Sequence, residues 1–207
     1  MRSAALASLL IAIIAPAGVA AQEAEAPLVV TPEQAEGPFY PVEIPADHDD
    51  DLTVVEGAAE PALGTRLELS GRLLRSDGSV VEGATVEIWQ TDHQGIYLHP
   101  EDPGFPSLDP GFQGYGEAVT DADGRWSFRT ILPNVYGNRP RHIHAKVRLG
   151  DDELLTTQIY FVDTGVGLEG SVALTDSDLD ALITELVPLT GDDTTDAVAA
   201  EHEIVLP

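Results

Sequence analysis

Short runs of alternating apolar and polar residues, separated by turn-forming residues, constrain the fold of this chain more than any other feature. Six such runs cover residues 66–74, 85–91, 125–130, 142–149, 154–161 and 202–206. A period of two places successive side chains on opposite faces, as in a half-buried β-strand. Turn sequences such as DADG and GDDE lie between the runs. The pattern predicts an all-β fold, a β-sandwich or barrel of mostly antiparallel strands, and we take the sandwich as the expectation.

One segment departs from this pattern and predicts a single short helix. Residues 175–187 place apolar side chains at helical spacing, with Ser177 or Thr175 available as a cap and Pro188 as a stop. The apolar residues concerned are Leu179, Leu182, Ile183, Leu186 and Val187.

The N-terminal region predicts export. Residues 1–20 combine a basic Arg2, an apolar run and small residues ending at Ala20, which is the layout of a secretory signal peptide. The apolar run is too short to span a bilayer, which disfavours a membrane anchor. We therefore expect a periplasmic or secreted protein. Residues 21–61 are then an extended acidic arm, and residues 62–207 form one β-sandwich domain.

Composition excludes several classes of function. The chain has no cysteine, so neither disulfide scaffolds nor thiolate metal sites are available, and any metal would need His, Tyr, Asp or Glu. The net charge is −26, from 36 acidic and 10 basic residues. Such a surface is repelled by nucleic acid and by anionic membranes, so neither is an expected partner.

The stretch RPRHIHAKV, residues 139–147, holds the most informative histidines. If it forms a strand, His142 and His144 share a face, and Lys146 continues that face. Two adjacent imidazoles can bind a metal, but they can also form the polar face of a half-buried strand. These residues alone leave both readings open.

If His142 and His144 bind a metal, the candidate partners without sulfur are tyrosines, carboxylates and the other histidines. Tyr97 lies in GIYLHP and Tyr136 in PNVYGNRP, both on glycine-containing loops. Tyr136 comes six residues before His142, on the loop that enters the same predicted strand. A loop tyrosine is more often a half-buried packing residue, so each tyrosine alone is a weak signal.

Six stretches, taken in order, carry a family resemblance: TPEQAEGPFYP, GATVEIWQTDHQGIYLHP, TDADGRWSFRT, RPRHIHAKV, TTQIYF and EHEIVL. Through them the chain resembles the intradiol ring-cleavage dioxygenases, the family of protocatechuate 3,4-dioxygenase and the catechol 1,2-dioxygenases. The resemblance covers most of the chain after residue 20. It implies a β-sandwich core, in agreement with the strand pattern.

The resemblance also implies a mononuclear non-haem Fe(III) bound by two tyrosinates and two histidines. Phenolate oxygens are hard anionic donors suited to the ferric ion. The implied ligands are Tyr97, Tyr136, His142 and His144. Tyr136 has a second implied role as the labile ligand that takes a proton from the substrate. Arg139 is implied to stabilise charge on the ring, and Gln158 to orient a reacting oxygen.

The implied reaction joins a catechol-type diol with dioxygen to give a cis,cis-muconate-type dicarboxylate. The small-molecule diol and dioxygen are thus the expected partners, and a homo-oligomer stays open. Only GNRPR separates Tyr136 from His142, so the identity of the catechol does not carry over. The family stretch EGPFY, residues 36–40, has no assigned role. The alternatives are a non-catalytic exported β-sandwich module, or a relative that binds metal without turnover.

Overall fold

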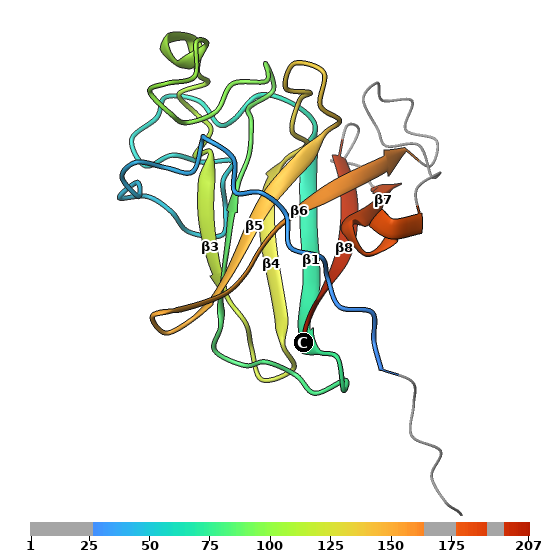
Figure 1. Ribbon diagram of the computed structural model, residues 1–207. Coiled ribbons are helices and arrows are strands. Elements are labelled where there is room, and N and C mark those ends of the chain that lie inside the picture. The colour runs from blue at the N-terminus through green and yellow to red at the C-terminus, as the bar shows by residue number, and fades with distance from the viewer. Residues whose placement is uncertain (1–26, 164–176, 190–196) are drawn as a thin grey trace, which may run out of the picture.

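The computed structural model describes residues 27–163, 177–189 and 197–207 (Figure 1). The expected signal peptide, residues 1–20, lies outside these ranges. Within them, no helix is long and apolar enough to cross a membrane.

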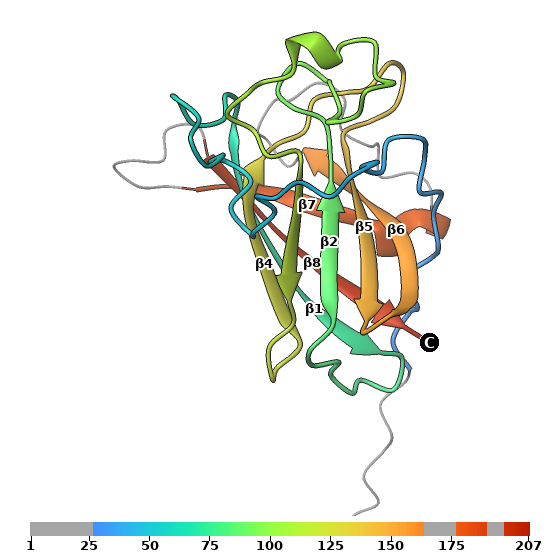
Figure 2. The ribbon, with the colours of Figure 1, turned by 90° about the vertical axis from the view of Figure 1, so that its left-hand side faces the viewer.

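Eight strands in the described residues form one sheet in the order β3-β2-β5-β6-β7-β8-β1-β4. Most neighbours are antiparallel; β1–β8 and β6–β7 are parallel. The two outermost strands, β3 and β4, contact each other, so the sheet curls into a nearly closed, sandwich-like barrel (Figure 2). The predicted all-β class is confirmed. The strand bounds are β1 Arg66–Arg75, β2 Thr85–Trp89, β3 Tyr115–Val119, β4 Arg125–Ile131, β5 His142–Leu149, β6 Asp152–Asp163, β7 Ile183–Pro188 and β8 Ala197–Leu206.

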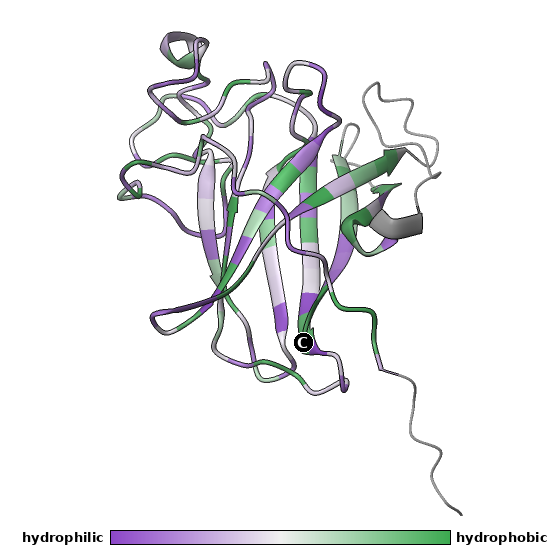
Figure 3. Ribbon diagram, viewed as in Figure 1, coloured by the Kyte–Doolittle hydropathy of each residue, from purple (hydrophilic) through white to green (hydrophobic). Residues whose placement is uncertain are grey.

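The core lies inside the curled sheet. Strands β1 and β4 alternate buried and exposed residues, as their period of two predicts, and polar and apolar bands alternate along them in Figure 3. Trp126 and Phe128 of β4 are buried, and Trp126 packs directly over Gly71 of β1, where an added Cβ would collide with its ring. Trp89 is also buried, so both tryptophans are core residues.

The predicted helix is wrong over its second half. Ser177–Leu182 forms a 3-10 helix, and Ile183–Pro188 continues as strand β7. This strand pairs with both β6 and β8 and so joins these two strands within the sheet. Because Ile183 and Thr184 are β-branched and gain cross-strand partners here, tertiary pairing overrides the helical spacing.

The described part of the N-terminal arm, residues 27–61, runs along the sheet without forming a strand of its own. The backbone N–H groups of Thr31, Gln34 and Leu52 donate to carbonyls of Val205, Thr156 and Arg129, respectively. The arm is therefore tied to β8, β6 and β4 in turn.

His202 of β8 is a buried histidine outside the site. Its side chain is 4% exposed, and its Nε2 has no hydrogen-bond partner. Burial lowers the pKa of His202 to about 4 from 6.5.

Stability is therefore expected to fall with acid between about pH 6.5 and pH 4. The folded state keeps His202 neutral in this window while the unfolded chain takes up the proton, so acid favours unfolding by at most about 1.4 kcal/mol per pH unit. The free energy of unfolding, measured by urea titration at several pH values, should depend less steeply on pH in His202→Leu, by the uptake of one proton. The variant His48→Asn on the arm should keep the pH dependence of the parent protein. Equal slopes for His202→Leu and the parent protein would contradict this account.

Candidate metal centre

Strand β5 places two histidines on the same buried face. His142 and His144 are both buried, while Ile143 between them points into the apolar core. β5 pairs with β2 and β6, and in this register His144 lies opposite Trp89 on one side and Gln158 on the other. The two imidazole centroids lie 5.0 Å apart. The predicted shared face is thus present at the end of the sheet where β2 ends and β5 begins (Figure 2).

Hydrogen bonding fixes the tautomer of His142. Its Nδ1 lies 2.7 Å from the carbonyl oxygen of Pro140, which can only accept, so Nδ1 carries the proton. The lone pair is then on Nε2, which lies 3.0 Å from the hydroxyl oxygen of Tyr97. Burial lowers the pKa of His142 to about 4, so the ring is neutral at pH 7. A neutral imidazole oriented by a backbone carbonyl is the form in which histidine binds metals.

His144 sits in an apolar setting with an unsatisfied ring nitrogen. Its ring stacks on Trp89 with centroids 4.8 Å apart and 13° between the planes. Its Nδ1 is buried and has no hydrogen-bond partner. Burial, followed by the nearby His142 and Arg139, lowers the pKa of His144 to about 3. Buried polar atoms are rarely left unpaired, so this nitrogen fits a ligand-binding role better than a purely structural one.

Tyr97 reaches the histidines from the loop between β2 and β3, residues 90–114. Its backbone N–H donates to Asp102 Oδ2 at 3.0 Å, and its ring lies almost wholly buried. Burial raises the pKa of the Tyr97 hydroxyl well above 10, with a partial offset from the positive charge of Arg139. The phenol is therefore neutral by itself, and a bound cation would favour the phenolate.

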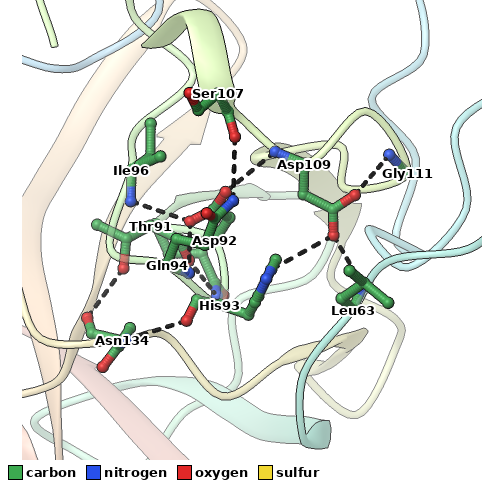
Figure 4. Close-up of polar contacts among 11 residues, drawn as sticks. Leu63, Thr91, Asp92, His93, Gln94, Ile96, Ser107, Asp109, Gly111 and Asn134 are labelled. Carbon is green, nitrogen blue, oxygen red and sulfur yellow. Dashed lines mark hydrogen bonds and ion pairs between the residues drawn. The ribbon is translucent and has the colours of Figure 1, made fainter. Parts of the chain in front are cut away.

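A buried carboxylate organises this loop (Figure 4). Asp92 Oδ1 accepts the backbone N–H of Gln94 at 2.8 Å and of Ile96 at 3.0 Å, and its Oδ2 accepts that of Asp109 at 3.0 Å. A carboxylate that accepts several backbone N–H groups fixes the loop from within. Asp92 is a positioning residue that sequence reasoning missed, although the Asp-x-x-Gly spacing of DHQG is typical of a turn.

The loop carrying Tyr136 is fastened to the loop carrying Tyr97. Asn134 Nδ2 donates to the carbonyl of His93 at 2.9 Å, and Thr91 Oγ1 donates to the carbonyl of Asn134 at 2.9 Å (Figure 4). The rings of Tyr97 and Tyr136 meet edge to face with centroids 5.2 Å apart. Tyr136 is only partly buried, and burial raises its pKa. The four predicted ligands thus lie in one cluster, which we call the tyrosine–histidine cluster (Tyr97, Tyr136, His142 and His144).

A guanidinium group borders this cluster. Arg139 Nη2 donates to Gln158 Oε1 at 2.6 Å and to the Tyr160 hydroxyl at 3.1 Å, and Tyr160 in turn donates to the same Gln158 oxygen at 2.9 Å. Among the described residues no carboxylate forms an ion pair with Arg139. In so acidic a chain an arginine would ordinarily form a structural ion pair, and Arg139 forms none within the described ranges. Tyr160, whose ring centroid lies 5.9 Å from that of His142, is a further site residue that the sequence did not single out.

Other candidates lie beside the cluster and not in it. His99 is buried, and its ring lies against that of Phe39. Tyr115 donates to Glu117 Oε1 at 2.8 Å and packs in the aromatic group around Trp89. A hollow of about 580 Å³ lies over β1, β3 and β4, and none of the four cluster residues lines it.

The donor set suits a hard trivalent cation. In the described part of the chain, no group of three or more histidines and carboxylates could hold a metal ion, so a metal here depends on the tyrosines. Two neutral imidazoles and two phenols that can ionise form such a set, and phenolates favour ferric iron. The residues present therefore fit the iron that the family resemblance implies.

Comparisons with known proteins agree with this arrangement. A family model described as Dioxygenase matches residues 35–206. The protocatechuate 3,4-dioxygenase beta chain of Burkholderia cepacia is 42% identical over 126 residues, covering 56% of this chain and 52% of that protein. Catechol 1,2-dioxygenase 1 of Acinetobacter lwoffii is 30% identical over 187 residues, covering 82% and 56%. The chain spans about half the length of the curated relatives it matches.

Solved structures show the same fold. The dioxygenase domain of a dioxygenase–carbohydrate-binding protein fusion from Streptomyces sp. SirexAA-E superposes with a TM-score of 0.62 at 28% identity, covering 86% of this chain and 98% of that one. An intradiol ring-cleavage dioxygenase from Tetranychus urticae gives a TM-score of 0.64 at 21% identity, covering 86% and 94%, and supports the fold alone.

Proposed function

The chain belongs to the intradiol ring-cleavage dioxygenases, and from that premise we propose that it uses Fe(III) and dioxygen to cleave a catechol-type diol. The product would be a cis,cis-muconate-type dicarboxylate. The observation that carries the proposal is the convergence of two loop tyrosines and two strand histidines on one buried cluster. A binding module of the same fold would have no need of that convergence.

The tyrosine–histidine cluster would hold the iron. When bound, Fe(III) would supply a Lewis acid that chelates the two catechol oxygens and draws electron density from the ring. The Nε2 atom of His142 is already free of a proton, because Nδ1 donates to Pro140. Tyr136 is the less buried of the two tyrosines, so its phenolate oxygen is the more accessible base for a catechol proton.

Arg139 and Gln158 would act on the substrate and not on the metal. The guanidinium group of Arg139 is held by Gln158 and Tyr160, so its positive charge is fixed in place before the diol arrives. A preorganised charge stabilises negative charge that develops on the ring as oxygen attacks. The amide of Gln158 is held in turn by the carbonyl of Ala35, at 2.7 Å from Nε2, and can orient a reacting oxygen.

An absorption spectrum with an iron assay tests this function directly. Purified protein loaded with ferric iron should show a broad visible tyrosinate-to-iron band, and catechol added without oxygen should shift it. Admitting oxygen should then yield a muconate. A colourless protein that takes up no ferric iron would leave a β-barrel binding module, and a coloured protein without product would leave a metal-binding relative that has lost turnover.

We also propose that the protein acts after export, because residues 1–20 have the layout of a signal peptide. N-terminal sequencing of the protein recovered outside the cytoplasm should begin at residue 21 or 22.

A further inference from the structure

Lys146 is a buried lysine that the proposed chemistry does not use. It follows His142 and His144 on the same face of β5, and its side chain is only 6% exposed. Lysine is almost never this buried without a partner. Its contacts therefore indicate what it is there to hold.

The contacts of Lys146 lead to the N-terminal arm. Its Nζ lies 2.6 Å from Glu36 Oε2, and it sits 3.8 Å from the centroid of the Tyr40 ring, within the range of a cation–π contact. A second carboxylate, Glu153 on β6, lies 3.5 Å from the same nitrogen. Tyr40 is fixed as well, because its hydroxyl donates to Glu87 Oε2 at 2.7 Å. Lys146 thus holds both ends of the EGPFY stretch, residues 36–40.

The residues between these two ends lie against the tyrosine–histidine cluster. Phe39 stacks on Tyr97 with centroids 4.9 Å apart and meets the edge of Tyr136 at 5.3 Å. Gly37 has a φ of +76°, and a Cβ added to it would lie 3.4 Å from Cε1 of His144. The backbone conformation favours glycine at this position, and the contact distance shows that residue 37 lies directly beside the imidazole of His144.

We propose that Lys146 is a positioning residue that clamps residues 36–40 over the tyrosine–histidine cluster. The arm contributes to the site only while Glu36 and Tyr40 are held, since Glu36 is itself nearly half exposed and would otherwise turn to water. Release of the clamp withdraws Phe39 from the two tyrosine rings and opens the substrate side of the cluster to solvent. The consequence for substrate rests on the proposed function, whereas the clamp itself does not.

The test variant is Lys146→Met, which removes the ammonium group but keeps a long unbranched side chain. The Phe39–Tyr40 bond is a chymotrypsin site inside the clamped stretch, and the Tyr40–Pro41 bond is not cleaved because proline follows it. We expect cleavage after Phe39 in the metal-free protein to speed up by at least tenfold. Glu36→Gln should speed cleavage less, because it weakens only the Lys146–Glu36 contact, whereas Lys146→Met also removes the contacts with Tyr40 and Glu153. The double variant should be no faster than Lys146→Met alone, because Lys146→Met already removes the Lys146–Glu36 contact. Arg129→Met is the control, because it removes the exposed ion pairs of Arg129 on β4 with Asp51 of the arm and Glu68 of β1 but touches no contact of residues 36–40. It should leave this rate unchanged.

In iron-loaded protein the clamp should affect substrate binding more than the chemical step. We expect Lys146→Met to raise the KM for catechol about tenfold, to change kcat less than threefold, and to shift the visible tyrosinate band. Unchanged cleavage after Phe39 in Lys146→Met, or additive effects of the two substitutions, would overturn the clamp. If the parent protein bound no iron, the proposed function would fail, and the proteolysis result would still decide the clamp.

Discussion

Replacing Tyr97 with phenylalanine is expected to abolish stable binding of ferric iron while leaving the fold intact. The variant loses a single oxygen, the one that lies 3.0 Å from Nε2 of His142. Groups that only orient a metal ligand typically contribute about 10- to 100-fold in affinity, so loss of a ligand itself should cost at least about 100-fold. Iron content after gel filtration and the visible tyrosinate band both measure this loss, and turnover should fall with them.

Tyr115→Phe is the matched control for this substitution. Tyr115 is as deeply buried as Tyr97, but its hydroxyl donates to Glu117 and not to a histidine. Removing either hydroxyl should cost a similar free energy of unfolding, about 1–3 kcal/mol, because each substitution removes one side-chain hydrogen bond of the folded state. Iron binding should separate the two variants. Equal iron content in both would show that Tyr97 is a packing residue and that the ligand set is wrongly assigned.

The strands of the barrel were predictable because burial on one face imposes a period of two. β1, β4, β5 and β6 lie where the alternating runs placed them. β7 was not predictable in this way: Leu182 and Leu186 are both fully buried, a spacing that suits a helix, yet the residues from Ile183 onward are fixed by pairing with β6 and β8. Pairing between segments far apart in sequence leaves no local signal, so a helical spacing of apolar residues was misread.

The residues of the tyrosine–histidine cluster were predictable from the sequence, but the contacts that position them were not. The HxH spacing on a strand requires His142 and His144 to share a face, and the family resemblance pointed to the two tyrosines. Neither source indicates that Asp92 organises the Tyr97 loop, because a buried carboxylate that binds backbone N–H groups looks in sequence like any loop aspartate. The ion pair of Lys146 with Glu36 joins residues 110 positions apart and is equally invisible in the sequence. Contacts of this kind depend on how the arm crosses the finished barrel.

Replacing Arg139 with methionine is expected to lower kcat by about 100- to 1,000-fold, or about 3–4 kcal/mol, the range found when one preorganised charge-stabilising donor is removed. The methionine keeps the length of the stem but removes the donors to Gln158 and Tyr160. Iron content and the visible band of the resting protein should stay close to those of the parent. Steady-state oxygen consumption with catechol, measured beside an iron assay, checks both expectations.

Two further variants decide whether this loss reflects the charge of Arg139 or its place in the structure. Arg148→Met removes a cation near the end of β5 that is opposite the cluster, where Arg148 lies 3.8 Å from Glu87, and it should leave kcat unchanged. Arg139→Lys retains the charge but not the planar fork that reaches Gln158 and Tyr160 together, so it should recover only part of the rate. If Arg139→Met instead lost iron in proportion to activity, the guanidinium would be a structural support of the β4–β5 loop through its hydrogen bonds to Gln158 and Tyr160 on β6. Full iron content with a slow ring-cleavage step is the result that assigns its positive charge to the reaction.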